Sequence, residues 1–461
     1  MNIIQCLEDP KLLGQFIKTP ETFTAWRTFH KASAGIPGPT REELKIYREC
    51  TGRSKWPKQA ADESWMIIGT RGGKSFNTAL KAAHLAVFVD YPMLSPGEVG
   101  TVIVVAPVRR QARVIKRYLS GFFKQNPLLA PMVVSDSNEE LVLNNGIEVA
   151  ILSDDFRGLR NYTAVAVVID EAAYLGGAES ASPDVEILRS LRTRLLNTEG
   201  PLLAISSPYA RKGIVFDTHR RHFGKDGDPI LVWKAGSGVM NPTLSRKKMD
   251  RMREEDPEGA AADLDAEFRS DLEDYVRREV VEACVIPGRY ELPFIQKGVT
   301  YRAFADPSGG SKDSMTLAIS HAEGEVAVLD VIREAKPPFS PDKVVTEFSD
   351  TLRSYGLSRV TGDRYAGMWP RERFSKHGVT YDVAEKPKSD LYQALLPMLN
   401  SGTVELLDNP RLTTQIVNLE RRTARGGRDS IDHPAGMHDD LANAAAGALV
   451  TLKINKMAGV W

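Results

Sequence analysis

Short apolar runs alternate with helical patterns along the first half of the chain. Glycine, proline or polar residues bound each run, as is typical of strands that are buried on both faces. Because strands that alternate with helices usually form parallel sheets, we expect an α/β fold whose largely parallel sheet is covered on both sides. The expected strands are Trp65–Ile68, Val102–Val105, Glu148–Leu152, Ala164–Ile169 and Leu202–Ile205.

A second sheet pattern begins at Tyr301 and has a different order of elements. Three apolar runs follow one another without a helix between them, which predicts a three-stranded meander. A helix over Asp342–Tyr355 comes next, and an alanine-rich helix, Leu441–Leu452, lies near the end. The meander strands are Arg302–Ala305, Met315–Ser320 and Glu325–Val331, and two later strands are Arg359–Gly362 and Val379–Val383.

Two remaining segments are helical and carry no sheet pattern. Lys11–Tyr47 is interrupted by a glycine and proline cluster, and 240–275 is dense in charge, which predicts a connector between two cores. The formal charge of the whole chain is zero, so attraction to a nucleic acid would need local basic patches. No apolar stretch is long enough to cross a bilayer, so we expect no membrane association and a cytoplasmic location.

Three cysteines, Cys6, Cys50 and Cys284, lie far apart along the chain. Their spacing matches neither a zinc site nor a disulfide framework, and it fits a reducing compartment. We therefore interpret all three as structural.

A glycine-rich loop follows the first expected strand and precedes a helix that begins near Phe76. Backbone NH groups of such a loop can hold phosphates at a helix N-terminus, as in P-loop ATPases. Lys74 would contact the outer phosphates of ATP, and the Ser75 hydroxyl would ligate Mg²⁺. The first glycine usual in such loops is replaced by Ile68. The loop residues are Gly69, Thr70, Arg71, Gly72, Gly73, Lys74 and Ser75.

Two adjacent carboxylates end the apolar strand Ala164–Ile169. Asp170 at this place would assist Mg²⁺ coordination and Glu171 would polarise the attacking water, as in P-loop ATPases of the additional-strand type. The alternative is a glycine-rich turn and a sheet that only resemble such an enzyme. Two further segments, Ala106–Gln111 and Ile205–Pro208, follow strand ends that we expect to face the nucleotide.

Three acidic points are spaced along the last third of the chain. Asp306 and Asp363 each follow a strand, while Asp439 and Asp440 open the last helix. If they converge, they can hold two Mg²⁺ or Mn²⁺ ions about 4 Å apart for phosphodiester hydrolysis. Asp306 and Asp363 are alternatively turn residues, and one of the last two is alternatively a helix cap. Between these two, we favour Asp440 as the ligand.

In this order, these motifs resemble the large terminase subunits of tailed bacteriophages, which drive DNA into capsids and cut it. The resemblance covers most of the chain and includes Arg157–Leu159 before the acidic strand and Ser206–Pro208 after it. It implies an RNase H-like nuclease at the second site and Arg71, Arg157 or Arg160 as a phosphate-contacting arginine. Two departures are Thr70, where many relatives have the arginine, and Asn443, where they often have a further acid.

Basic residues supply the candidate DNA contacts. A basic hairpin just before the third acidic point can hold phosphates; its arginines are Arg421, Arg422, Arg425 and Arg428, with Lys386 and Lys388 as further candidates. A helix after the second strand carries Arg109, Arg110, Arg113, Lys116 and Arg117, where DNA contact and a solvated face are equally good interpretations. We interpret His433 and His438 as structural and leave them outside the core site.

The sequence thus predicts four segments: a helical segment of the ATPase domain over 1–60, a P-loop ATPase core over 61–235, a connector over 236–295 and an RNase H-like nuclease domain over 296–461. The resemblance further implies double-stranded DNA, a portal protein and a small terminase subunit as partners. It also implies a homo-oligomeric ring on the portal and a place in the host cytoplasm, transiently attached to a procapsid. The alternatives are a repair helicase-nuclease, or a nuclease whose nucleotide site is a structural switch.

Overall fold

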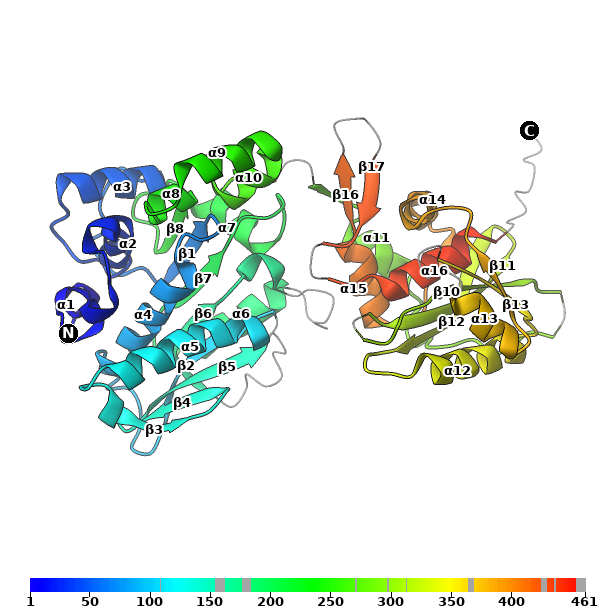
Figure 1. Cartoon of the computed structure of the whole chain (residues 1–461), viewed down its shortest axis with the longest axis horizontal. Coiled ribbons are helices and arrows are strands. Elements are labelled where there is room, and N and C mark those ends of the chain that lie inside the picture. Colours follow the sequence, from blue (N-terminus) through cyan, green and yellow to red (C-terminus); the bar gives the residue numbers. More distant parts are fainter. Residues whose placement is uncertain are drawn as a thin grey trace. The chain divides into compact units, whose positions relative to one another are not determined.

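A computed structural model describes residues 1–107, 109–153, 162–175, 184–269, 272–296, 298–311, 313–363, 369–423, 429–434 and 437–452. The chain forms two compact units, Met1–Ser270 and Asp271–Trp461, called the N-terminal and C-terminal units below (Figure 1). The segment predicted as a connector, 236–295, is divided between them. In the described part of the chain, no helix has the length and apolar character needed to span a membrane.

The N-terminal unit is built on an eight-stranded sheet of order β3-β4-β5-β2-β6-β7-β1-β8. Across the sheet, the six strands β5, β2, β6, β7, β1 and β8 are all parallel to their neighbours, whereas the pairs β3–β4 and β4–β5 are antiparallel. The strands are β1 Glu63–Ile68, β2 Gly100–Ala106, β3 Val133–Asp136, β4 Glu140–Leu143, β5 Ile147–Ser153, β6 Thr163–Ile169, β7 Leu202–Ser206 and β8 Ile230–Ala235. Because β7 lies between β1 and β6, the glycine loop and the acidic pair follow strands separated by one other strand. This order confirms the predicted P-loop fold of the additional-strand type.

Helices cover both faces of this sheet, so successive side chains of one strand enter different cores. In β1, Met66 and Ile68 pack in the core beneath α1–α5, whereas Trp65 and Ile67 pack in the core beneath α6 and α7. Figure 1 shows α4 and α5 lying across the sheet on the same face. The helices are α1 Ile3–Glu8, α2 Thr24–Ser33, α3 Arg41–Thr51, α4 Lys74–Val87, α5 Arg109–Gln125, α6 Asp184–Arg194, α7 Gly213–His222, α8 Ser237–Met240, α9 Arg246–Glu255 and α10 Pro257–Asp263.

The C-terminal unit is built on a six-stranded sheet of order β14-β13-β10-β11-β12-β15. The pairs β10–β11 and β11–β12 are antiparallel, and the remaining pairs are parallel. The strands are β10 Tyr301–Asp306, β11 Met315–Glu323, β12 Val326–Ala335, β13 Arg359–Gly362, β14 Thr380–Val383 and β15 Val404–Glu405. An antiparallel meander extended by two parallel strands beside its first strand is the RNase H-like arrangement, as predicted.

The helices of the C-terminal unit again lie on both faces of the sheet. α16 packs against β10 and β11 together with α14 and α15, and α12 and α13 belong to the core of the other face. These helices are α11 Arg278–Ala283, α12 Pro341–Ser354, α13 Trp369–Lys376, α14 Lys388–Ser401, α15 Pro410–Asn418 and α16 Asp440–Val450. A separate three-stranded sheet joins β9 Leu272–Asp274 to the hairpin of β16 Glu420–Thr423 and β17 Asp429–Asp432.

The five strands predicted for the first sheet and the meander of the second are all present. The sequence reasoning missed β8, although Ile230–Ala235 is an apolar run that offered a clear signal. It also missed β3, which is mostly exposed at the edge of the sheet, and β4, whose alternating buried residues Leu141 and Leu143 span only four positions. Cys6, Cys50 and Cys284 are buried free thiols, as expected.

Candidate active sites

The glycine-rich loop of the N-terminal unit joins β1 to α4 as a strand, a tight turn and a helix. Gly73 has a φ of 88°, which places it in the left-handed region that favours glycine, and Arg71 has a φ of 60°. At Gly69 a Cβ atom would lie 2.3 Å from the Ser237 hydroxyl oxygen, so a side chain there would displace the loop. The geometry is that of a phosphate-binding loop at a helix N-terminus.

Residues far away in sequence hold this loop from outside. The Trp26 indole NH donates to the Gly72 carbonyl at 2.9 Å, and the Ser237 hydroxyl donates to the Thr70 carbonyl at 2.6 Å. The Asn241 amide donates to the Arg71 carbonyl at 3.0 Å. Sequence reasoning missed all three, because nothing in the sequence links positions 26, 237 or 241 to the loop.

Lys74 lies inside the loop at the first position of α4. Its ammonium donates to the Ile68 carbonyl at 2.9 Å, the Gly69 carbonyl at 3.3 Å and the Ser207 hydroxyl at 2.7 Å. Burial lowers the pKa of Lys74, and the carboxylates of Glu171, Asp170 and Asp263 oppose this effect. Lys74 therefore connects the loop to the end of β7, where the sequence predicted a strand end facing the nucleotide.

Asp170 and Glu171 lie at the end of β6, on the same edge of the sheet as the loop. The Asp170 backbone NH donates to the Val105 carbonyl of β2 at 2.8 Å, which fixes the end of the strand. Burial and the neighbouring Glu171 carboxylate raise the pKa of Asp170 to about 7. Glu171 has a φ of 50°, a left-handed conformation that non-glycine residues seldom adopt. Such backbone strain is often found at functional sites.

Several residues predicted to act near the nucleotide cannot be placed. Arg157, Gly158, Leu159 and Arg160 lie outside the described residues. Arg71 is exposed at the loop, and Ser75 is half-buried in the first turn of α4. The choice among the three predicted arginines therefore stays a prediction.

The acidic residues of the C-terminal unit converge from three elements. Asp306 ends β10, Asp363 follows β13 and Asp440 begins α16. Together with Asp439 and Asn443 they line one cavity of about 680 Å³. Burial raises the pKa of Asp306 well above its usual value, and the carboxylates of Asp440, Asp363 and Asp439 raise it further. Carboxylates that repel one another in this way favour a bound cation.

Asn443 bridges two of these carboxylates. Its amide nitrogen donates to Asp306 Oδ2 at 2.8 Å and to Asp363 Oδ2 at 3.4 Å. Its amide oxygen is buried and has no hydrogen-bond partner among the described residues. A buried oxygen without a partner, next to hard carboxylate donors, fits a divalent cation such as Mg²⁺ or Mn²⁺.

The two adjacent aspartates at the start of α16 have different environments. Asp439 accepts a hydrogen bond from the Tyr392 hydroxyl at 2.7 Å and pairs with the Lys388 ammonium at 3.0 Å. Its side chain makes no helix-cap hydrogen bond. Asp440 instead accepts from the Ser314 backbone NH at 3.2 Å, and burial raises its pKa to about 6. The Lys388 ammonium compensates the negative charge of Asp439, whereas His438 is the cationic group that opposes the raised pKa of Asp440.

The histidines excluded from the core site lie in the same cavity. His433 Nε2 is 3.8 Å from a carboxylate oxygen of Asp439, and His438 Nδ1 is 3.4 Å from one of Asp313. Asp432, His433 and Asp439 could hold a metal ion by their spacing, although Lys388 also pairs with both aspartates. Lys388 and Tyr392 were missed as partners of Asp439, because they come from α14 and only the fold brings them close.

The hairpin predicted to hold phosphates is formed by β16 and β17. Arg421 is exposed and Arg422 half-buried, and the Arg422 guanidinium donates to the His433 carbonyl at 3.3 Å. Arg425 and Arg428 lie outside the described residues. Of the two candidate lysines, Lys388 lines the acidic cavity, whereas Lys386 is exposed and is not among the residues that line it.

No protein-family profile and no curated protein sequence matches the chain. Among solved structures, the large terminase of bacteriophage HK97 aligns at 18% identity over 92% of this chain and 99% of its own, with a TM-score of 0.38. A large terminase of a thermophilic bacteriophage, in complex with ADP, aligns at 11% identity over 85% and 94%, with a TM-score of 0.37. The large terminase nuclease of a thermophilic phage, with bound magnesium, aligns at 16% identity over 38% and 96%, with a TM-score of 0.31. These three solved structures are large terminases, and at TM-scores below 0.5 their likeness to this chain carries no argument.

Proposed function

We propose that this chain is the large subunit of a phage terminase, a motor that hydrolyses ATP to move double-stranded DNA into a capsid and that cleaves concatemeric DNA. The observation that carries the proposal is the pairing of two sites in one chain. The N-terminal unit combines the loop at Lys74 with the acidic pair Asp170 and Glu171, and the C-terminal unit combines Asp306, Asp363 and Asp440 on an RNase H-like sheet. A motor and a metal-dependent nuclease in this order fit an enzyme that packages and cuts DNA.

In the ATPase reaction, the backbone NH groups of Gly73, Lys74 and Ser75 at the start of α4, with the Lys74 ammonium, would hold the phosphates of ATP. The NH groups of Gly69, Thr70 and Gly72 instead donate to the carbonyls of Ala235, Asp263 and Gly69 and so fix the shape of the loop. Ser75 and Asp170 would hold Mg²⁺, which would supply charge neutralisation at the phosphates. Glu171 is placed in this proposal as the base that would accept the proton of the attacking water. The bond between Lys74 and Ser207 supports a role for the end of β7 in sensing the nucleotide.

In the nuclease reaction, Asp306, Asp363 and Asp440 would hold divalent cations, with the Asn443 amide oxygen as a neutral ligand. At this place such cations would lower the pKa of a bound water and neutralise charge on the leaving oxygen. Asp439 is close to the same centre, and its pairing with Lys388 and Tyr392 favours a role in holding the start of α16. Arg421 and Arg422 are placed on the hairpin that precedes the site and would contact DNA phosphates.

The first experiment is cleavage of a supercoiled plasmid in Mn²⁺, with ATP turnover measured in parallel. We expect Asp306→Asn to abolish cleavage and keep ATP turnover, and Lys74→Ala to abolish turnover and keep cleavage. If neither activity is detectable in the unaltered protein, the proposal fails. ATP binding without turnover, in an unaltered protein that still cleaves DNA, would instead support the structural-switch alternative, whereas turnover that is lost in Lys74→Ala or Glu171→Gln would exclude it.

A repair helicase-nuclease is the competing function with the same two chemistries. Such enzymes need strand separation, and the described residues contain only one sheet with a phosphate loop. Unwinding of a forked duplex by the purified chain would favour this alternative over a packaging motor.

Partners and location follow from the packaging role. We propose recruitment to a portal ring, with a small terminase subunit, as a homo-oligomeric ring transiently attached to the procapsid in the host cytoplasm. The zero net charge of the chain supports recruitment by proteins, because its overall field does not gather DNA. Native mass spectrometry with purified portal rings tests this; a chain that never binds them would contradict it.

A further inference from the structure

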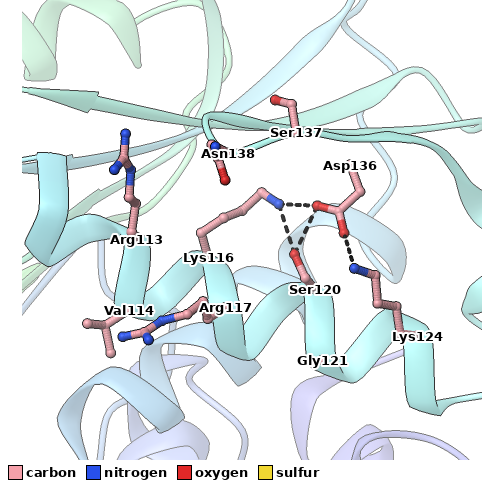
Figure 2. Close-up of a pocket in the computed structure, with 10 residues that line it drawn as sticks. All are labelled: Arg113, Val114, Lys116, Arg117, Ser120, Gly121, Lys124, Asp136, Ser137 and Asn138. Atoms are coloured by element: carbon pink, nitrogen blue, oxygen red, sulfur yellow. Dashed lines mark hydrogen bonds and ion pairs between the residues drawn. The ribbon is translucent and has the colours of Figure 1, made fainter.

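One face of α5 and the turn between β3 and β4 enclose a groove in the N-terminal unit. The groove has a volume of about 1240 Å³ (Figure 2). None of the described residues that line it belongs to the phosphate loop or to the acidic pair. Its residues on α5 recur at the spacing of one helix face, so their side chains lie along the same side. The lining residues are Arg113, Val114, Lys116, Arg117, Ser120, Gly121, Lys124, Asp136, Ser137 and Asn138.

Two lysines of the groove are held in place by a single carboxylate. Lys116 pairs closely with Asp136, and the Lys124 ammonium lies 3.1 Å from the other oxygen of the same carboxylate. The Ser120 hydroxyl donates to Asp136 at 2.9 Å. Figure 2 shows these side chains meeting across the groove. Because the Lys116 side chain is only 5% exposed, its charge is fixed at the wall of the groove.

Two arginines of the groove have no such partner. Arg113 and Arg117 are exposed, and no carboxylate among the described residues pairs with either of them. Four cationic side chains and one carboxylate line the groove, so it is strongly positive on a chain whose net charge is zero. Paired guanidinium groups on one helix face suit the regularly spaced phosphates of a nucleic acid backbone.

Small residues leave room between these cations. Gly121 lies in the middle of the helix face, and a Cβ atom there would meet nothing within 4 Å. Ser120, Ser137 and Asn138 add hydroxyl and amide groups that can hydrogen-bond phosphate oxygens. Among the residues that the structure describes, no aromatic side chain lines the groove, so they offer nothing on which a base could stack.

We propose that this groove binds the phosphate backbone of duplex DNA without reading its sequence. This inference rests on the proposed motor function and names the surface that grips the DNA. α5 follows directly after β2, whose Val105 carbonyl accepts the hydrogen bond from the Asp170 NH. The groove and the acidic pair are therefore attached to the same strand, so a shift at the nucleotide would reach the DNA through α5.

The first test measures binding of a fluorescent duplex to the full chain in EDTA, where metal-dependent cleavage is prevented. Arg113→Ala with Arg117→Ala removes two phosphate contacts, which lowers the slope of log K against log salt by about 1.8. At 0.1 M salt this corresponds to a loss of roughly 60-fold in affinity, equal for all sequences. The matched control is Lys247→Ala with Lys248→Ala, two exposed lysines of α9 that should leave the slope unchanged.

Gly121 provides a variant that alters the groove without disturbing the fold. Gly121→Glu places a carboxylate in open space among the cations, and it should weaken duplex binding much more than the similarly sized Gly121→Gln. ATP turnover without DNA should be unchanged in all of these variants, since none touches the nucleotide site.

The outcomes separate the groove from the function on which it rests. If the unaltered chain binds duplex DNA and the arginine and Gly121→Glu variants bind it equally well, the groove is not the DNA site. The proposal would also be overturned if the arginine and Gly121→Glu variants lost the ability to bind an acidic protein but still bound DNA. Failure of the unaltered chain to bind duplex DNA would contradict both the groove and the packaging motor.

Discussion

The ion pair between Lys388 and Asp439 is expected to hold α14 against the start of α16. The Asp439 side chain is 6% exposed and that of Lys388 is 26% exposed. Burial by itself lowers the pKa of Lys388, but the carboxylates of Asp439 and Asp432 together outweigh this effect and raise the pKa above its ordinary value. The lysine is therefore charged at every ordinary pH, and its removal leaves a buried carboxylate without a cation.

The magnitude of this effect follows from the geometry. Removing one partner of a fully buried pair costs about 3–5 kcal/mol. Because Lys388 is partly solvated and Asp439 keeps its hydrogen bond from Tyr392, we expect about 2 kcal/mol for Lys388→Met. In metal-free buffer, this loss of stability should speed hydrogen exchange roughly 30-fold for those α16 amides whose exchange requires local opening of the contact between α14 and α16.

The control and the second variant make the test specific. Lys386→Met removes an exposed lysine two residues upstream and should leave the exchange of α16 unchanged. Lys388→Met combined with Asp439→Asn removes the stranded charge, so most of the lost protection should return. The electrostatic reasoning would be refuted if α16 exchanged at the same rate in Lys388→Met and Lys386→Met. It would also be refuted if the losses of protection from Lys388→Met and Asp439→Asn simply added in the double variant.

Three further predictions concern other contacts. Gly447→Ala should destabilise the C-terminal unit by about 1–3 kcal/mol, because its Cβ would lie 2.2 Å from the Phe304 ring, and Phe304→Leu in the same chain should recover part of this loss in urea unfolding. Trp26→Phe should remove about 1 kcal/mol of support from the phosphate loop by deleting the bond to Gly72, and calorimetry should show weaker ATP binding with an unchanged fold. Burial raises the pKa of Asp330 to about 6, although the hydrogen bond to His321 opposes this shift, so ionisation of Asp330 lowers the stability of the fold as pH rises from about 4 to 6. Asp330→Asn should therefore flatten that part of the stability profile in thermal unfolding at different pH values. An unchanged profile would contradict this assignment.

Much of the fold followed from local pattern. The buried strands of both sheets are continuous apolar runs, and the residues at their ends, such as Asp170 and Asp306, are marked by the point where each run stops. Strand order is not local, yet the positions of β7 and the meander agree with the expected fold types. The convergence of Asp306, Asp363 and Asp440 could be predicted because strand ends and a helix start meet at one edge of such a sheet.

What the sequence could not reveal are contacts between distant segments. Trp26 and Gly72, or Lys388 and Asp439, come together only when helices pack on the sheet, and neither spacing nor composition marks the pairs. The basic groove is a similar case. The spacing of Arg113, Lys116 and Arg117 indicated a charged helix face, but Asp136 and the turn at Ser137 close the groove from strands that had not been predicted.

The short strand β9 gives the C-terminal unit a mechanical property. β9 is the first strand of that unit and pairs antiparallel with β16, with Leu272 opposite Arg422 and Asp274 opposite Glu420. The Tyr275 NH adds a bond to the Leu419 carbonyl at 3.1 Å. The segment that arrives from the N-terminal unit is thus fastened to the hairpin whose second strand leads to Asp432 and His433. Peeling β9 from β16 would break these hydrogen bonds, so it would disturb the margin of the acidic cavity before it disturbed the six-stranded sheet of the same unit.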